Sequence, residues 1–342
     1  MINLGLVGVG YWGPNLARNL NSAENASLAW VCDADQKSLG KIAASYPKTK
    51  TTTDINEMLA AVDLDAVVVA TPAGTHFDIA KQVLQAGKHA MVEKPLAMTG
   101  EECDELIDLA ASKNLRLMVG HTFLYSPPVL KLKELVDSGE VGDVYYAYST
   151  RVNLGRIRKD VNAMWNLAPH DIAIFLNLFG AAPVSVSAKG VTHIQPGIED
   201  VVFMLLDFPN NITAHVHVSW LDPGKVRKLT LVGSQKMVVY DDTNADAKIQ
   251  IFDKGVTKVA NGSAESFTSF GEFQLLMRAG DVLIPKIAAT EPLKMECQHF
   301  VDCIISGEQP LTDGVHAKQV VRVLEAAQES MQSGGCPVEV KL

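Results

Sequence analysis

"LGLVGVGYWGPNLARNL", residues 4 to 20, decides the first part of the fold. It joins a short apolar run to a helical pattern through Gly8, Gly10 and Gly13, which have GxGxxG spacing. In that pattern the first glycine permits a tight turn, the second lets the backbone approach a pyrophosphate, and the third lets helix and strand pack closely. The stretch therefore predicts a strand, a turn and a helix whose N-terminus binds the phosphates of a dinucleotide.

An acidic residue follows the second apolar run at the distance expected for such a site. Asp33 comes 20 residues after Gly13, directly after "SLAWVC". A carboxylate there accepts a hydrogen bond from a ribose 2′-hydroxyl and repels a 2′-phosphate, so NAD is favoured over NADP. The plainer interpretation is a surface turn residue in "DADQ".

Apolar runs and helical patterns alternate over the first 120 residues. The runs are nearly continuous, as in strands that are buried on both faces of a sheet. They lie at 3–9, 28–32, 66–70, 90–92 and 116–119. Regular alternation of this kind predicts a doubly wound parallel sheet of the Rossmann type with right-handed crossovers.

After about Phe123 the pattern becomes rich in β-strands. Six strand-like segments, joined by turn residues such as "FPNN", predict an open antiparallel sheet. We expect helices near 128–138, 169–179, 292–306 and 314–333. The expected fold class is α/β, with an NAD-binding domain at 1–122 and a substrate-binding and oligomerisation domain at 123–342.

Length and composition agree with two globular domains. The 342 residues exceed the roughly 250 to 300 at which a single core stops growing. A net charge of -9 argues against a nucleic-acid surface, because phosphate binding relies on clustered cations. Five scattered cysteines indicate neither a disulfide framework nor a zinc site, and no basic leader or membrane-length apolar run is seen, so we expect a cytoplasmic protein with no membrane partner.

The fourth main strand ends in "VEKPLAMTG", residues 92 to 100. Pro95 restricts Lys94 to an extended conformation at the carboxyl edge of the sheet. A lysine there can hydrogen-bond a substrate hydroxyl and stabilise a developing alkoxide, although a solvated lysine is the plain alternative. Further residues near this edge are expected to contact the cofactor: Tyr11, Trp12, Thr71, Pro72, Thr75, His76, Glu93, Lys94 and His121.

"WNLAPHDI", residues 165 to 172, contains the candidate proton acceptor. A neutral imidazole near pH 7 suits His170 to take a hydroxyl proton, whereas the plain alternative is a first-turn helix residue bonded to backbone. We expect Asp171 to stabilise the positive N-terminal end of the same helix.

Several motifs together resemble the Gfo/Idh/MocA oxidoreductases: "GVGYWG", "ATPAGTH", "AGKHAMVEKPLA", "LMVGHTFLY" and "APHDI". The resemblance covers essentially the whole chain. It implies that Lys94 and His170 act on a substrate carbinol, and that the antiparallel sheet mediates a homodimer or homotetramer. Many members have an aspartate four residues before the histidine, where this chain has Asn166, an amide that cannot accept a proton.

The substrate is expected to be a sugar or nucleotide-sugar. "STRVNLGRIRKDVNAMW" concentrates arginines that suit a diphosphate or a carboxylate, although a solvated loop is an equal alternative. The resemblance points to carbon 3 of a UDP-N-acetylglucosamine type sugar. The expected pocket contains Lys94, Phe123, Tyr125, Arg151, Asn153, Arg156, Arg158, Asn162, Trp165, Asn166 and His170, some of which could instead pack between domains.

Three other functions stay open. The first is oxidation of inositol or a free sugar, and the second is reduction of a keto-sugar by the same residues. The third is a non-catalytic NAD-binding regulator, for which loss of Lys94 or His170 would be typical; both are present. His215 and His217 share one face of a strand, but no carboxylate or cysteine joins them in sequence, so we expect no metal.

Overall fold

The computed structural model describes residues 1–155, 157–256 and 277–342. The chain divides into two compact units: unit 1 comprises 1–126, 290–325 and 341–342, and unit 2 comprises 127–289 and 326–340. The expected single boundary between residues 122 and 123 differs from this division. The difference arises because the segment 290–325 folds with the N-terminal unit.

Unit 1 contains a six-stranded parallel sheet in the order β3-β2-β1-β4-β5-β6. Its strands are β1 (Ile2–Val7), β2 (Ala26–Cys32), β3 (Lys50–Thr52), β4 (Ala66–Val69), β5 (His89–Glu93) and β6 (Leu117–Gly120). The doubly wound parallel sheet is thus confirmed. The sequence did not reveal β3, because three residues, "KTT", are too short and too polar for a periodic signal.

The helices of unit 1 bury apolar residues against this sheet. They are α1 (Gly13–Asn21), α2 (Gln36–Ser45), α3 (Ile55–Leu59), α4 (His76–Gln85), α5 (Gly100–Ser112) and α9 (Pro292–Ser306), with short 3-10 segments η1 (Ala73–Thr75) and η2 (Thr122–Tyr125). Leu16 and Leu20 of α1 share one core with Cys297 and Phe300 of α9. This shared core explains why α9 belongs to unit 1. The last long helix, α10 (Gly314–Gln332), crosses the division at residue 325.

Unit 2 contains a nine-stranded sheet within the described ranges, in the order β14-β13-β12-β11-β7-β10-β9-β8-β15. Its strands are β7 (Val144–Val152), β8 (Ser185–Val191), β9 (Val201–Phe208), β10 (Ile212–Ser219), β11 (Val226–Gly233), β12 (Met237–Asp241), β13 (Ile249–Val256), β14 (Met277–Leu283) and β15 (Val338–Glu339), with η3 (Pro209–Asn211) between β9 and β10. The sheet is largely antiparallel, as expected, and is mixed because β7 and β10 pair in parallel. Apolar alternation reports which face is buried and not the direction of pairing.

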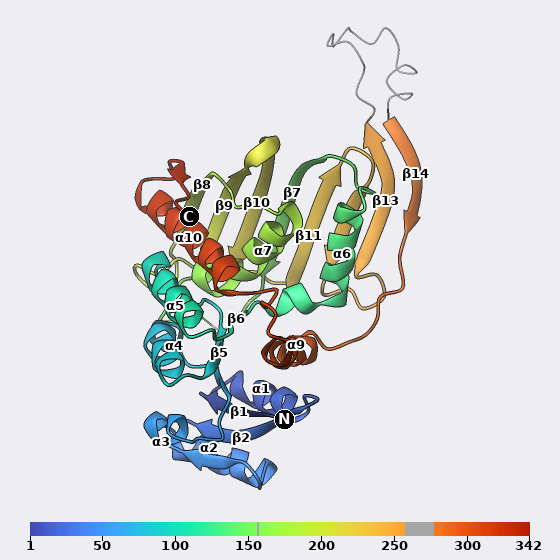
Figure 1. Ribbon diagram of the computed structural model, residues 1–342. Helices are drawn as coiled ribbons and strands as arrows, with labels where there is room; N and C mark the ends of the chain where they lie inside the picture. Colours follow the sequence, from blue (N-terminus) through green and yellow to red (C-terminus); the bar gives the residue numbers. More distant parts are fainter. Residues whose placement is uncertain (156, 257–276) are drawn as a thin grey trace, which may run out of the picture. The chain divides into compact units, whose positions relative to one another are not determined.

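Two helices, α6 (Pro127–Asp137) and α7 (Ala163–Phe179), lie on one face of this sheet (Figure 1). Period-2 alternation in β7 turns Ser149 and Arg151 toward the buried face, while Tyr146 and Tyr148 stay exposed on the other. Among the described residues, none of the helices combines the length and apolar character needed to cross a membrane.

Candidate active site

The glycine loop after β1 has the geometry that a dinucleotide requires. Gly8 has a φ of 94°, and an added Cβ would lie 2.7 Å from the Ala70 carbonyl oxygen. A Cβ on Gly13 would lie 2.4 Å from the Gly8 carbonyl oxygen, whereas nothing lies within 4 Å of that position on Gly10. The first and third glycines are therefore needed for packing, and the second leaves its backbone open for a phosphate at the start of α1.

The Asp33 carboxylate is hydrogen-bonded to the backbone of the glycine loop. Its Oδ2 accepts a hydrogen bond from the Val9 backbone N–H at 2.6 Å, and its Oδ1 accepts one from the Asp35 N–H at 2.8 Å. Asp33 thus connects the end of β2 to the glycine loop, which a mere surface turn residue would not do. Each carboxylate oxygen has a second lone pair with which a ribose hydroxyl can bond.

Hydrogen bonds of the Thr75 hydroxyl stabilise the turn after β4. The Thr75 hydroxyl lies 2.7 Å from the Pro72 carbonyl oxygen and 2.8 Å from the Thr71 hydroxyl. At the start of α1, Tyr11 is 84% exposed and Trp12 is 40% exposed. These side chains are accessible in unit 1 for a cofactor contact.

Two histidines expected at the cofactor are structural instead. His76 is buried, with Nδ1 2.7 Å from the Pro95 carbonyl oxygen and Nε2 2.9 Å from that of Thr71. His121 is also buried, and its ring lies edge-on to that of His316, with 5.4 Å between centroids. Burial lowers the pKa of His121 well below its usual value. Neither ring presents a surface to a cofactor, so both expectations are corrected.

Glu93 and Lys94 end β5 and begin the turn that follows it. Burial raises the pKa of Glu93 to about 7, while Lys94 and a hydrogen bond from Trp12 act in the opposite direction. A carboxylic acid with a raised pKa therefore lies beside the candidate lysine.

Glu296 of α9, a buried acid that was not predicted from the sequence, accepts a hydrogen bond from the Thr122 hydroxyl at 2.8 Å. Burial raises its pKa well above the usual value, and the nearby Glu93 adds to the effect. A signal was present: Glu296 occupies the helical stripe of Leu293, Cys297 and Phe300, where an apolar residue is the rule.

Helix α7 of unit 2 carries the candidate base. It begins at Ala163 and not at Pro169, because Asn162 caps it: its Oδ1 accepts a hydrogen bond from the Trp165 N–H at 3.0 Å. The Asn162 Nδ2 donates to Glu199 at 2.7 Å and to Gln328 at 3.1 Å. The side chains of Asn162 and Trp165 are buried, so these two are corrected from sugar contacts to structural residues.

His170 lies in the middle of α7, half-buried, and not in its first turn. One turn earlier on the same helix, Asn166 accepts a hydrogen bond at its Oδ1 from Trp220 Nε1, at 3.1 Å. At the position where many members of the family have an aspartate, the amide oxygen of Asn166 thus bonds the indole of Trp220.

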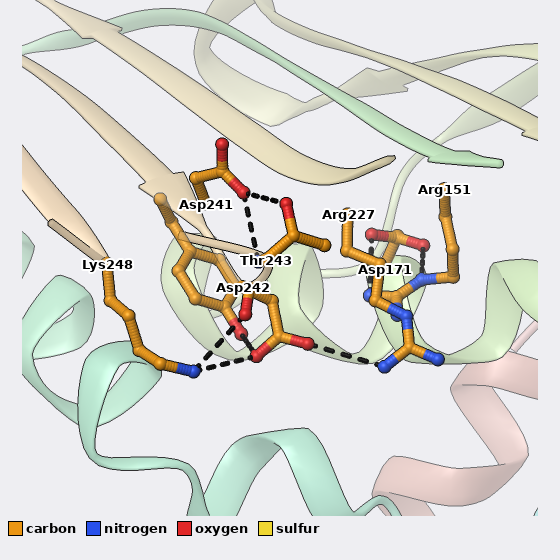
Figure 2. Close-up of polar contacts among 8 residues, drawn as sticks. Arg151, Asp171, Arg227, Asp241, Asp242, Thr243 and Lys248 are labelled. Carbon is orange, nitrogen blue, oxygen red and sulfur yellow. Dashed lines mark hydrogen bonds and ion pairs between the residues drawn. The ribbon is translucent and has the colours of Figure 1, made fainter. Parts of the chain in front are cut away.

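Arg151 does not lie at the surface as a phosphate ligand would. Its Nε lies 2.6 Å from Asp171 Oδ2 and its Nη2 lies 3.1 Å from Asp171 Oδ1, with side chains 5% and 4% exposed (Figure 2). This pair corrects two expectations. Arg151 is buried and bound by a carboxylate, and Asp171 lies far inside α7, away from the helix N-terminus that it was expected to stabilise.

The other expected pocket residues divide into four groups. Arg158 Nε bonds Asp160 within its own loop at 2.8 Å, and Arg156 lies outside the described residues. Tyr125 is buried with its hydroxyl 2.9 Å from Thr312 Oγ1, so its expected sugar contact is corrected to core packing in unit 1. The half-buried side chains of Phe123 and Asn153 keep surface that a ligand can reach.

On the exposed face of the unit 2 sheet, the rings of His215 and His217 both stack on Phe203, with centroids 6.5 and 4.4 Å away. Within the described ranges, no three His, Cys, Asp or Glu side chains gather as metal ligands do. The two histidines are therefore part of an aromatic surface.

Two family profiles match the chain. "Oxidoreductase family, NAD-binding Rossmann fold" matches residues 2–121, and "GFO/IDH/MocA C-terminal domain" matches residues 129–239. Both describe one family, and their order along the chain is that of the two sheets described above.

Individual relatives agree with the profiles. UDP-N-acetylglucosamine 3-dehydrogenase of Acidithiobacillus ferrooxidans is 26% identical over 93% of both chains. Its crystal structure aligns with a TM-score of 0.82 at 24% identity, covering 97% of this chain and 98% of that one. GenD2 from gentamicin A biosynthesis, solved with NAD, also has a TM-score of 0.82, at 24% identity over 100% and 97% of the two chains.

Some curated relatives match over less than two thirds of their length. Inositol 2-dehydrogenase of Rhizobium meliloti is 29% identical over 58% of this chain and 61% of its own. An uncharacterized oxidoreductase of Streptococcus pneumoniae is 27% identical over 61% of this chain and 60% of its own.

Proposed function

Because the chain belongs to the Gfo/Idh/MocA family and contains its NAD-binding Rossmann domain, we propose that it oxidises carbon 3 of a nucleotide-activated sugar of the UDP-N-acetylglucosamine type. The observation that carries this choice is the alignment with UDP-N-acetylglucosamine 3-dehydrogenase over 93% of both chains. The dehydrogenase activity on a CH–OH group follows from the family, whereas the sugar is our proposal.

The proposed chemistry assigns one role to each of two side chains. Lys94 hydrogen-bonds the carbinol oxygen and eases the loss of its proton, because an ammonium group stabilises a developing alkoxide. The neutral imidazole of His170 takes that proton as general base. Nicotinamide, when bound, supplies the hydride acceptor. Reduction of a keto-sugar uses the same two residues in reverse.

The cofactor fits the residues of unit 1. The open backbone at Gly10, the accessible start of α1 and the carboxylate of Asp33 suit the pyrophosphate and one ribose of NAD. We assign the cofactor to unit 1 and sugar binding mainly to unit 2, where His170 lies.

Fewer cations are available to bind the nucleotide part of the substrate than the sequence suggested. Arg151 is bound by Asp171, and Arg158 is bound by Asp160. The arginine-rich loop is therefore a weaker argument for a diphosphate than the full-length relative is. Inositol oxidation is the second candidate, favoured by the inositol 2-dehydrogenase relative.

The test is NADH formation with UDP-N-acetylglucosamine, UDP-glucose and inositol as separate substrates. We expect turnover with UDP-N-acetylglucosamine. We expect Lys94→Ala and His170→Ala to lower kcat by about 10² to 10⁴-fold. NAD binding, measured by calorimetry, should be largely retained in both variants, because the pyrophosphate and ribose contacts at the glycine loop and Asp33 are unchanged.

Exposed Lys189 of β8 supplies the matched control, since Lys189→Ala removes a cation from unit 2 without touching α7 or the arginine-rich loop. Turnover with inositol and with no activated sugar would refute the proposed substrate. Unaltered rates in Lys94→Ala or His170→Ala would refute the role of that residue.

A further inference from the structure

Helix α7 is interrupted by a proline directly before His170. Pro169 lies inside the helix, seven residues after its N-cap. A proline at that position donates no hydrogen bond to the carbonyl of Trp165, four residues earlier, and its ring crowds that carbonyl. The backbone alone therefore holds the turn that carries His170 less firmly than an uninterrupted helix would.

On the C-terminal side of the proline, a buried ion pair holds the helix to the sheet. Asp171 directly follows His170 and receives two nearly parallel hydrogen bonds from Arg151 of β7, at 2.6 and 3.1 Å. A bidentate arginine–carboxylate contact fixes both distance and orientation. Because successive helical residues point about 100° apart, holding Asp171 against β7 sets the direction in which His170 projects.

The neighbouring arginine of the sheet pairs with a different carboxylate. Arg227 of β11 lies opposite Arg151 in the strand register, and Arg227 Nη1 pairs with Asp242 at 3.3 Å. Asp242 also accepts a hydrogen bond from the Tyr240 hydroxyl at 3.2 Å and pairs with Lys248 at 3.4 Å (Figure 2). The second arginine thus has a carboxylate of its own, which is more exposed than Asp171.

On the N-terminal side of the proline, a second contact holds the helix. Asn166 lies one turn before His170 on the same helix face. Its Oδ1 accepts a hydrogen bond from Trp220, an indole that is 1% exposed at the end of β10. The turn with the missing backbone hydrogen bond is therefore fixed on both sides by buried side chains from the sheet.

We propose that Arg151 and Asp171 are positioning residues for the general base, and that this ion pair replaces the backbone restraint that Pro169 removes. The proposal rests on the proposed role of His170. The two side chains are buried and bonded to each other, so they would affect catalysis through His170 and not by binding the substrate.

The test removes the pair without leaving a buried charge. Replacing a buried ion pair by apolar residues of similar volume is often neutral for stability, so Arg151→Met/Asp171→Leu is expected to fold. Because a misplacement of 1 Å can cost about 10²-fold, we expect kcat to fall by about that factor while the KM for the sugar and the NAD affinity stay unchanged. Arg227→Met removes the neighbouring, more exposed pair and should leave kcat as in the wild type.

A second comparison separates positioning from general damage. If the pair acts through His170, then Arg151→Met/Asp171→Leu should cause no additional loss in a His170→Ala background, because residues that act as a unit are not additive. An additional loss of the same size in that background would overturn the proposal. So would a wild-type kcat in the double variant.

If the double variant does not fold, the kcat of the Arg151→Lys variant tests the proposal. Lysine keeps the charge and loses the planar fork, so we expect a lower kcat with unchanged KM and NAD affinity, and a wild-type kcat would overturn the proposal. A failure of the proposed function gives different results. If the sugar is wrong, the wild-type protein does not turn it over; if His170 is not the base, His170→Ala retains the wild-type rate, whatever the pair does.

Discussion

At the scale of single residues, the carboxylate of Asp33 bonds the glycine loop and is also expected to distinguish NAD from NADP. Its carboxylate binds the Val9 N–H in the glycine loop and still has lone pairs for a ribose hydroxyl. We predict that Asp33→Ala weakens NAD binding by about 1.5 to 3 kcal/mol, the value of a charged hydrogen bond, and weakens NADP less, because the 2′-phosphate loses a repelling neighbour. Calorimetric titration with both cofactors measures the two affinities.

Asp63, an exposed residue just before β4, offers a control in Asp63→Ala: the variant loses a carboxylate at the amino edge of the same parallel sheet, whereas the glycine loop follows the carboxyl end of β1. Equal weakening of both cofactors in Asp33→Ala would show that the carboxylate only supports the loop.

Residue roles were the hardest part to predict from the sequence. The glycine roles could be assigned, because each depends on backbone close to it in the chain or on an adjacent strand. The ion pair of Arg151 and the side-chain hydrogen bonds that Asn162 donates and Tyr125 forms could not, because each depends on a partner far along the chain. Arg151 bonds a residue 20 positions away, Asn162 one 37 positions away, and Tyr125 one 187 positions away. A polar residue in a loop-like sequence is readily taken for a ligand contact, because its hydrogen-bond partner in the folded chain cannot be identified from the local sequence.

At the scale of elements, α7 shows how a local rule can mislead. Proline is favoured in the first turn of a helix, so "APHDI" predicts a helix that begins at Pro169. Asn162 caps the helix earlier, and the proline is tolerated inside it. This shift moves His170 and Asp171 from the end of a helix to its middle, which changes what each can do.

The unit 2 sheet supports a prediction about assembly. Its exposed face carries Tyr146, Tyr148, Phe203 and Leu205, which are 42 to 47% exposed. We propose that a second copy of the chain covers this face, as the family resemblance implies, because clustered apolar side chains at a surface mark an interaction site. Sedimentation should give the mass of a dimer or tetramer, and Leu205→Lys should shift it toward the monomer.

Leu130→Lys is the matched control for that experiment, since Leu130 is similarly exposed but lies on α6. A monomeric mass for the wild-type protein would contradict the proposed assembly.

At the scale of the whole molecule, the order of elements was predictable and the grouping was not. Alternating strands and helices followed by β-rich segments gave the two sheets in sequence order, because hydrophobic periodicity is local. The assignment of 290–325 to unit 1 depends on α9 packing beside α1, a contact between residues almost 280 positions apart. No local pattern reports such a contact.

We propose that a hydride passes from carbon 3 of a UDP-N-acetylglucosamine type sugar to NAD. The most direct measurement uses UDP-N-acetylglucosamine with deuterium at carbon 3 and determines by mass spectrometry where the deuterium goes. We predict that the NADH formed contains it. NADH without deuterium, or no NADH from this substrate, would contradict the account.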